Sequence, residues 1–352
     1  MPVIGFDIGT FAAKAVLLSI KGKGRTKTVA LEGLGIAQMP FGIMSQWEEQ
    51  PLPARRAMSS AMSTLVKLSK LKGGRFAALS LSGDTMIIKK ISMPITTQKE
   101  LRSSLALEAE QYIPYPINEV IIDGHILSTD DQSGQMSVLL VAARKEVITN
   151  YIQAVTMTKV LKPNVIDVDA LALFNAYDFV YPESRQNAIL VDLGATLMHI
   201  TILQDGVPHT IKEENVGTQR ITEDIEDAFG VTPDEAEAIK LGTQEAPNPS
   251  EAAEIVERIV SNWIAALERA LDSVRVENPE YQLKKIVLAG GGAFFRGIAD
   301  QFSNHFGIPA EIFNPFRFVK VNTKKFDQAY LEYIGPQMAV SFGLAIRKEE
   351  VR

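Results

Sequence analysis

The chain has 352 residues, of which 46% are hydrophobic and 22% charged, as expected for a folded globular protein rather than a fibrous or disordered one. Its net charge of -6 argues against a nucleic-acid-binding protein, and the absence of cysteine excludes disulfide bonds. Because there is neither a signal-peptide pattern nor an apolar run long enough to span a membrane, we expect a two-domain cytoplasmic protein.

An apolar strand near the N-terminus ends in Asp7-Ile8-Gly9-Thr10, and a second apolar stretch runs from Ala12 to Leu18. Glycine lets backbone N–H groups approach anionic oxygens, and the preceding carboxylate can hold a water of hydrated Mg²⁺. The pattern therefore predicts a β-hairpin that binds phosphate. The basic run 21–27 is interpreted as a solvated turn between strands rather than a patch that follows a phosphate backbone.

Hydrophobic periodicity then alternates between helix and strand, with one interruption. The predicted elements are a helix through 57–71, a strand over 75–81, an inserted small subdomain over 84–143 with the order strand, helix, strand, strand, a helix from 145, a strand over 164–168 and a helix over 169–177. Gly73-Gly74 is interpreted as the C-cap of the first helix. A capping box at Thr97 and Glu100 starts the helix of the insertion, and Pro114 stops it.

The phosphate-hairpin pattern recurs at Asp192-Leu193-Gly194-Ala195-Thr196, after a predicted domain junction at 181–185. Two such hairpins predict one nucleotide held from both sides. A strand over 285–289 runs into Gly290-Gly291-Gly292-Ala293, before a helix predicted to start near Phe295. A glycine-rich turn alone also suits close strand-to-helix packing, but after two phosphate hairpins it indicates a nucleotide contact near a helix N-terminus.

A short helix is predicted between the capping box Thr232-Pro233-Asp234-Glu235 and Gly242. Glu237 and Lys240 share one face of this helix, because they are three residues apart. Two interpretations stay open for them: an exposed ion pair without a function, or a contact with the ribose or adenine of a nucleotide.

In this order the elements resemble those of the actin-like ATPase superfamily over nearly the whole chain. The two connecting helices of that fold would be 169–173 and 339–345, both rich in small residues that allow close crossing. Three segments are similar, more narrowly, to the PilM family, the cytoplasmic actin-like components of type IV pilus assembly. These segments are 108–116 (EAEQYIPYP), 138–146 (VLLVAARKE) and 161–169 (LKPNVIDVD).

The resemblance implies an α/β, actin-like two-domain fold, duplicated and ribonuclease-H-like, with the inserted small subdomain found in the division protein FtsA. The implied units are a first domain over 1–83 and 144–185, the insertion over 84–143, a second domain over 186–216 and 276–352, and a helical subdomain over 217–275.

The resemblance also implies ATP and Mg²⁺ between the two domains. Asp7 and Asp192 would orient Mg²⁺ through water, and Lys14 would neutralise phosphate charge instead of being a surface lysine on a strand. For Asp169 two interpretations stay open, a carboxylate that positions the attacking water or the N-cap of its helix. The full set of predicted nucleotide-binding residues is Asp7, Gly9, Thr10, Lys14, Asp192, Gly194, Thr196, Gly217, Glu237, Lys240, Gly290, Gly291, Gly292 and Ala293.

The implied output is protein binding, with slow or absent ATP hydrolysis. The N-terminal tail of a PilN-type inner-membrane protein would enter a groove between the first domain and the insertion, and other pilus platform or motor proteins are further candidate partners. Met86, Ile88 and the segment 112–116 either line this groove or simply pack the small subdomain. Membrane contact is then expected only through a partner.

Competing classes fit the sequence less well. A small-molecule kinase would need a motif for a catalytic base and a sugar cleft, and no such motif stands out. An Hsp70-like chaperone would need a separate substrate domain, which we do not expect in a chain that ends at Arg352. A membrane-tethered filament former of the FtsA type should end in an amphipathic helix, whereas 347–352 has no apolar face. A polymerising FtsA- or MreB-like actin and an active ATPase remain the alternatives.

Overall fold

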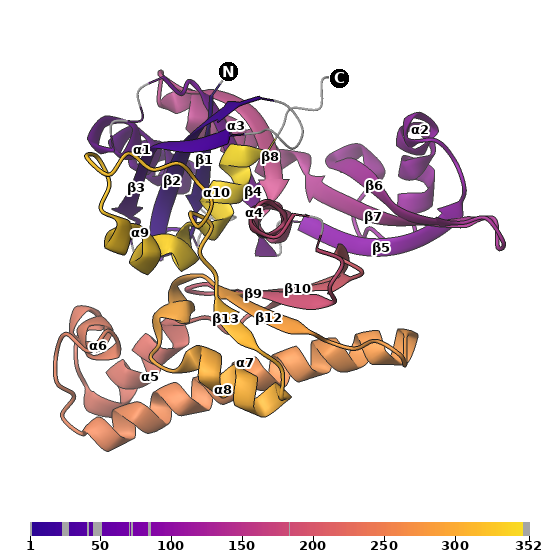
Figure 1. Cartoon of the computed structure of the whole chain (residues 1–352). Coiled ribbons are helices and arrows are strands. Elements are labelled where there is room, and N and C mark those ends of the chain that lie inside the picture. The colour runs from indigo at the N-terminus through magenta and orange to yellow at the C-terminus, as the bar shows by residue number, and fades with distance from the viewer. Residues whose placement is uncertain are drawn as a thin grey trace.

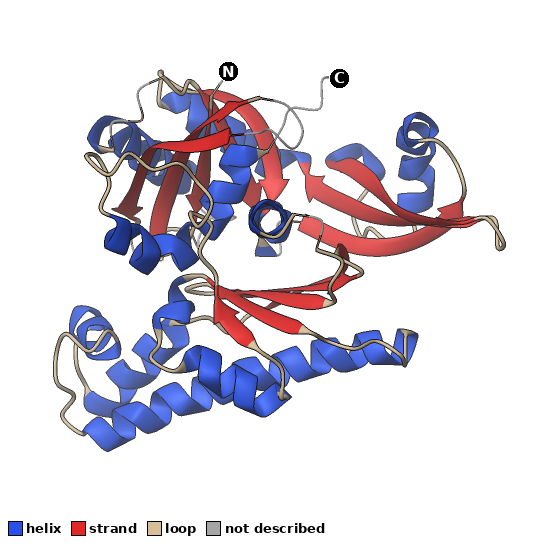
Figure 2. Cartoon of the chain, in the orientation of Figure 1, coloured by secondary structure: helices blue, strands red, loops and turns tan. Residues whose placement is uncertain are grey.

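The computed structural model describes residues 2–22, 28–40, 42–44, 51–69, 71, 73–83, 86–182 and 184–347. Within these ranges the chain forms two five-stranded sheets and one three-stranded sheet, with helices against them (Figures 1 and 2). Several sequence predictions lie outside the described residues: the turn over 23–27, residue 84 at one domain boundary, Glu183 in the predicted junction, and residues 348–352.

The first sheet has the strand order β3-β2-β1-β4-β8, in which the first three strands are antiparallel and the last two run parallel to β1. Its strands are β1 (Val3–Ile8), β2 (Ala12–Lys21), β3 (Thr28–Gln38), β4 (Phe76–Leu81) and β8 (Lys162–Val168). β1 and β4 are buried along almost their whole length, because helices cover both faces of the sheet. One face packs against α1 (Pro51–Leu68) and α3 (Lys145–Met157), and the other against α4 (Asp169–Val180) and α10 (Ala339–Ile346).

Helix α1 ends at Leu68, so the prediction that it continues to Gly73-Gly74 is wrong. The apolar spacing continued because Leu71 is buried, although it lies beyond the helix. Gly33 lies directly over Leu71, where an added Cβ would come within 2.6 Å of the leucine side chain. Leu71 therefore packs beneath β3 although it follows the helix.

The second sheet repeats this arrangement in the order β11-β10-β9-β12-β13. Its strands are β9 (Ala188–Leu193), β10 (Met198–Gln204), β11 (Val207–Glu214), β12 (Lys285–Ala289) and β13 (Ala310–Ile312). The helices on its outer face are α5 (Gln219–Phe229), α6 (Pro233–Lys240), the long α7 (Pro249–Glu277) and α8 (Ile298–Phe306), which enclose a core around Trp263 (Figure 1). α8 starts three residues later than predicted, because a 3₁₀ turn, η4 (Gly291–Phe294), follows the triple glycine.

The inserted segment forms the third sheet, in the order β5-β7-β6, and its predicted sequence of strand, helix, strand, strand is confirmed. The elements are β5 (Met86–Pro94), α2 (Gln98–Ala109), β6 (Val120–Asp130) and β7 (Gln135–Arg144). The Thr97–Glu100 capping box is present, and Leu101 and Leu105 of α2 are buried against the sheet. The insertion projects to the side of the first sheet and touches β11 (Figure 1).

The last part of the chain returns from the second sheet to the first. After β13, Lys320 forms a parallel bridge with Ala30 in β3, with hydrogen bonds to Val29 and Leu31. The chain then forms α9 (Gln328–Ile334), the 3₁₀ turn η5 (Gly335–Met338) and α10, which packs against α4, β1 and β2. The domain boundaries stay a prediction, but this last helix, placed in the second domain from sequence, completes the core of the first sheet.

The two predicted connecting helices cross at small residues. A Cβ added to Gly343 of α10 would overlap the carbonyl oxygen of Ala172 in α4, and one added to Gly5 of β1 would overlap that of Ser341. Such close backbone approach needs positions without side-chain volume. The prediction that small residues allow a close crossing is therefore confirmed.

Candidate functional site

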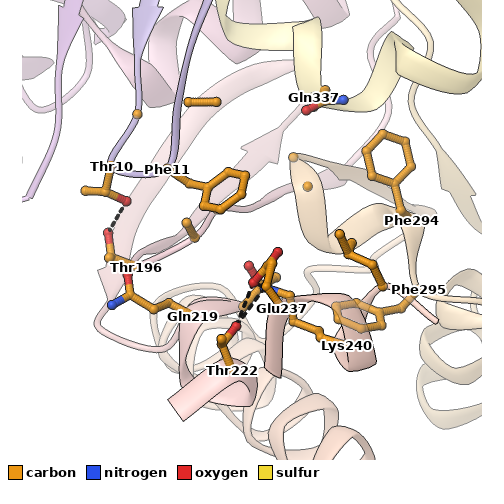
Figure 3. A pocket seen from close by; sticks show the side chains of 18 of the residues that line it. Thr10, Phe11, Thr196, Gln219, Thr222, Glu237, Lys240, Phe294, Phe295 and Gln337 are labelled. Atoms are coloured by element: carbon orange, nitrogen blue, oxygen red, sulfur yellow. Dashed lines mark hydrogen bonds and ion pairs between the residues drawn. The ribbon is translucent and has the colours of Figure 1, made fainter. Parts of the chain in front are cut away.

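A cavity of about 1270 Å³ lies between the two five-stranded sheets. Most of the predicted site residues line it: Asp7, Gly9, Thr10, Lys14, Asp169, Asp192, Gly194, Thr196, Glu237, Lys240, Gly290 and Gly291. Figure 3 shows the part of it between the first hairpin, α5, α6 and η4. The fold thus brings together residues from both halves of the chain.

The two Asp-x-Gly hairpins have matching geometry. In the first, the N–H of Gly9 donates to the carbonyl oxygen of Ala12 at 3.2 Å, and in the second, that of Gly194 donates to Leu197 at 3.0 Å. The turns face each other, since the hydroxyl oxygens of Thr10 and Thr196 are 3.3 Å apart (Figure 3). The predicted pair of hairpins therefore forms two sides of one cleft.

Lys14 points into the cleft and is not a surface lysine. Its Nζ lies 2.7 Å from Oδ2 of Asp7, and the side chains are 16% and 10% exposed. Burial opposes the charge on Lys14, but the Asp7 carboxylate outweighs it and raises the pKa of the lysine. The cleft thus holds a permanent cation next to the first hairpin, as a phosphate-binding site requires.

His199, which was not predicted as a site residue, lines the same cavity and is buried. Its Nδ1 lies 3.6 Å from Oδ2 of Asp192, and its Nε2 lies 3.1 Å from Oε1 of Glu213. Burial opposes the charged imidazolium, but these two carboxylates outweigh it and hold the pKa of His199 well above its usual value. In the sequence, His199 is visible as a histidine in a mostly apolar strand. Its two acidic neighbours follow only from the register of that strand with the strands on either side.

Asp169 is the first residue of α4 and not its N-cap, which is Val168. The N-cap interpretation is therefore wrong. The Asp169 carboxylate instead accepts a hydrogen bond from the hydroxyl of Ser80 at the end of β4, another residue that the sequence analysis missed. Burial raises the pKa of Asp169 to about 7, and the nearby carboxylates of Asp7 and Asp192 act in the same direction. A role in positioning water stays a prediction.

Replacing Asp169 by asparagine is expected to stabilise the nucleotide-free protein increasingly as the pH rises. Between the pKa of ~3.9 in the unfolded chain and the raised pKa in the folded protein, the folded state binds more protons than the unfolded state. The unfolding free energy of the wild type therefore falls as the pH rises through this range. Asparagine has no charge and keeps an oxygen for Ser80. Its advantage should be about 2–3 kcal/mol larger at about pH 8 than at about pH 5. Thermal unfolding at both pH values measures this, and an advantage independent of pH contradicts it.

Glu237 and Lys240 do form an ion pair, with Nζ and Oε2 2.5 Å apart, but it is not an exposed one. The lysine side chain is 7% exposed and the glutamate 21%. Thr222 of α5 accepts from Lys240 at 2.9 Å and donates to Glu237 at 2.8 Å, so the three side chains form one network at the cavity wall (Figure 3). The interpretation as an exposed surface pair is wrong, and the contact with ribose or adenine stays a prediction.

Three predicted residues, Gly217, Gly292 and Ala293, are not among those that line the cavity. A Cβ on Gly217 would overlap the backbone of Ala195, and one on Gly292 would lie 2.6 Å from Cβ of Leu193. These two glycines let the neighbouring turns pack against the second hairpin.

Aromatic side chains that the sequence analysis missed form part of the cavity wall. Phe294 and Tyr333 stack with their ring centroids 4.9 Å apart, and Phe11 of the first hairpin is 46% exposed in the cleft. Gln219 and Gln337 also line the cavity (Figure 3).

A family model described as "Type IV pilus assembly protein PilM" matches residues 5–349. The chain belongs to the PilM family. It is 26% identical to a solved chain described as "PilM-PilN type IV pilus biogenesis complex", with a TM-score of 0.85 and coverage of 99% of this chain and 98% of that one. Among curated proteins it is 25% identical over 396 residues to the cell division protein FtsA of Borreliella burgdorferi, which covers 99% of this chain and 91% of FtsA.

More distant solved structures share the fold of this PilM-family chain. MreB5 of Spiroplasma citri bound to AMPPNP is 13% identical with a TM-score of 0.50 and covers 97% of this chain and 94% of its own. The MamK double helical filament is 14% identical with a TM-score of 0.51 and covers 95% and 97%. The fold is therefore actin-like, as expected.

The candidate groove residues of this PilM-family chain occupy two different places. Met86 and Ile88 line a small cavity of about 320 Å³ between β5 and β11, together with Leu197 and Ile211. Tyr112 packs against the core beneath α2, as the packing interpretation expects.

The described part of this PilM-family chain has neither a membrane-spanning helix nor a cluster of direct metal ligands. No helix there is long and apolar enough to cross a membrane. No group of three or more histidine, aspartate or glutamate side chains in those ranges is arranged to hold a metal ion directly.

Proposed function

We propose that this PilM-family protein is a nucleotide-binding adaptor of the type IV pilus assembly platform, which binds Mg-ATP in its cleft and the N-terminal tail of a PilN-type inner-membrane protein. The observation that carries the nucleotide part is the facing pair of Asp-x-Gly hairpins, whose threonine hydroxyls are 3.3 Å apart. A single hairpin could be a tight turn, but two turns that meet at the wall of one cavity would present backbone N–H groups from both halves of the chain to one chain of phosphates.

The residues of the cleft suit an ATP molecule with its phosphates at the hairpins. Backbone N–H groups near Gly9 and Gly194 would contact phosphate oxygens, and Lys14 would neutralise their charge. Asp7 and Asp192 would hold waters of a Mg²⁺ ion, which would screen the phosphate charge. At the far end of the cavity the Thr222–Glu237–Lys240 network offers donors and acceptors for ribose hydroxyls.

Asp169 is placed to act on water if hydrolysis occurs. Its carboxylate faces the cavity and has a pKa of about 7, so that near neutral pH it is partly able to accept a proton. Phosphoryl transfer depends mainly on positioning and electrostatics, so a cleft that binds ATP tightly can still turn it over slowly.

The similarity to a solved PilM-PilN complex over 99% of the chain supports the PilN-type partner. The PilN-type partner would also bring this protein to the inner membrane, because the tail is the cytoplasmic end of that membrane protein. We expect the tail to enter the groove between the first domain and the insertion, and cross-linking of the bound tail to the chain tests this location.

The test is a calorimetric titration of a PilN-type tail peptide, and separately of Mg-ATP, into the full chain. We expect saturable binding of each with a stoichiometry near one. No binding of Mg-ATP would overturn the nucleotide part, and no binding of the peptide would overturn the adaptor part. Sedimentation with Mg-ATP distinguishes the alternative, because a polymerising actin would pellet in a nucleotide-dependent way.

A further inference from the structure

A row of three ionisable side chains crosses the second sheet at the level of the cleft. In the antiparallel register, His199 of β10 stands opposite Asp192 of β9 on one side and Glu213 of β11 on the other. Directly opposed residues on one face of a sheet are close enough to interact. The distances of 3.6 and 3.1 Å show that the three groups are in contact. The row therefore leads from the predicted Mg²⁺ carboxylate at one end to the edge strand of the sheet at the other.

The outer end of the row is bonded to the first half of the chain. Oε1 of Glu213, the same atom that faces His199, accepts a hydrogen bond from the backbone N–H of Gly83 at 3.1 Å. Gly83 lies between β4 of the first sheet and β5 of the insertion. Its φ of +67° favours glycine, and a Cβ there would lie 3.2 Å from the Leu197 side chain of the second hairpin. This link thus joins β11, the strand that carries Glu213, to the entry of the insertion.

A second contact joins β5 itself to β11. Nζ of Lys90 lies 2.6 Å from Nε2 of His209, and both are within 4 Å of Glu277 at the end of α7. The small cavity of about 320 Å³ lies alongside these strands and includes Gly83 and Glu213 in its wall. A shift of β11 relative to the cleft would therefore be transmitted to β5.

We propose that Glu213 and His199 are positioning residues that couple the nucleotide cleft to the inserted subdomain. Glu213 holds His199 against Asp192, and the same carboxylate oxygen anchors Gly83. If a metal engaged Asp192, it would compete with His199 for that carboxylate, so His199 would move towards Glu213 and the hydrogen bond from Gly83 to Glu213 would change. This inference rests on the proposed function, because it takes Mg-ATP and a partner tail as the two ligands.

The test compares the dissociation constant of the tail peptide with and without Mg-ATP. In the wild type we expect the two values to differ at least ~5-fold, the lower end of typical coupling between sites. In Glu213→Ala the ratio should fall to about 1, since the row is broken. The conservative Glu213→Gln keeps an oxygen for Gly83 but loses the charge that attracts His199, and it should give an intermediate ratio.

Glu214→Ala is the matched control. It changes the neighbouring residue of the same strand, whose carboxylate faces Arg269 at 3.5 Å instead of the cleft. This variant should keep the wild-type ratio. A second measurement does not depend on the peptide: hydrogen exchange of segments containing Gly83 and β5 should change on addition of Mg-ATP in the wild type and not in Glu213→Ala.

The outcomes distinguish a failure of the coupling from a failure of the proposed function. A wild-type ratio near 1, or a Glu213→Ala variant that keeps the wild-type ratio and exchange response, overturns the coupling while the proposed function stands. Failure of wild-type protein to bind Mg-ATP in the direct titration overturns the proposed function and the coupling with it. If Glu213→Ala does not fold, the Gln variant and the wild-type exchange experiment decide the question.

Discussion

Replacing Gly343 by alanine is expected to destabilise the protein by at least ~3 kcal/mol, at the upper end of what overpacking costs. The added Cβ would overlap the backbone oxygen of Ala172, and backbone cannot rotate away as a side chain can. α10 would have to move off α4, although it supplies Phe342 and Leu344 to the core of the first sheet. Alanine favours a helix over glycine by only ~1 kcal/mol, so the clash decides the sign.

Thermal or urea unfolding of the purified variant measures this effect. Gly291→Ala is the control for stability, because a Cβ there meets nothing within 4 Å. We expect the control to unfold close to the wild type. A Gly343→Ala protein as stable as the wild type would show that the two helices are not in close contact in solution.

Replacing Asp192 by asparagine is expected to weaken Mg-ATP binding by about 10–100-fold, the range for residues that hold a metal through an intermediate ligand. The variant keeps the size of the side chain and removes the charge that attracts a hydrated Mg²⁺. Asp7→Asn should have a similar effect, and both variants are measured because each also removes a second partner, Lys14 for Asp7 and His199 for Asp192. The loss should be large with Mg²⁺ and small when the metal is removed by a chelator.

Calorimetric titration with ATP in the presence and absence of Mg²⁺ tests this prediction. Asp131→Asn serves as the control, because Asp131 is exposed in the turn between β6 and β7 and does not line the cavity. This end of the insertion points away from the two five-stranded sheets (Figure 1). An unchanged affinity for Mg-ATP in both Asp7→Asn and Asp192→Asn contradicts the predicted role of these carboxylates.

Local patterns in the sequence predicted those parts of the fold and site that depend on neighbouring residues. The two Asp-x-Gly turns, the capping box at Thr97 and the small residues of the connecting helices each follow from one short segment. The end of α1 was predicted wrongly. Leu71 is buried beneath Gly33, so the helical spacing of apolar residues continues past the last residue of the helix.

The features that the sequence analysis missed depend on contacts between distant segments. His199 acquires its meaning only when the register of three strands places it between Asp192 and Glu213. Likewise, the sequence could not decide whether Glu237 and Lys240 form an exposed pair, because Thr222, which binds both, lies on another helix. A single sequence does not determine how strands pair or how helices pack, so side-chain networks of this kind could not be predicted from it.

The return of the chain to the first sheet has a consequence for protein synthesis. Gly5 and Val16 pack with α10, which consists of residues 339–346. Every strand of their sheet has already been synthesised when the ribosome reaches residue 168. At a translation rate of ~10 residues per second, this sheet waits on the order of 20 s for its last helix. During that time the part of its apolar face that α10 covers is open to water and to other nascent chains, so a chaperone that shields this part should act before the chain leaves the ribosome.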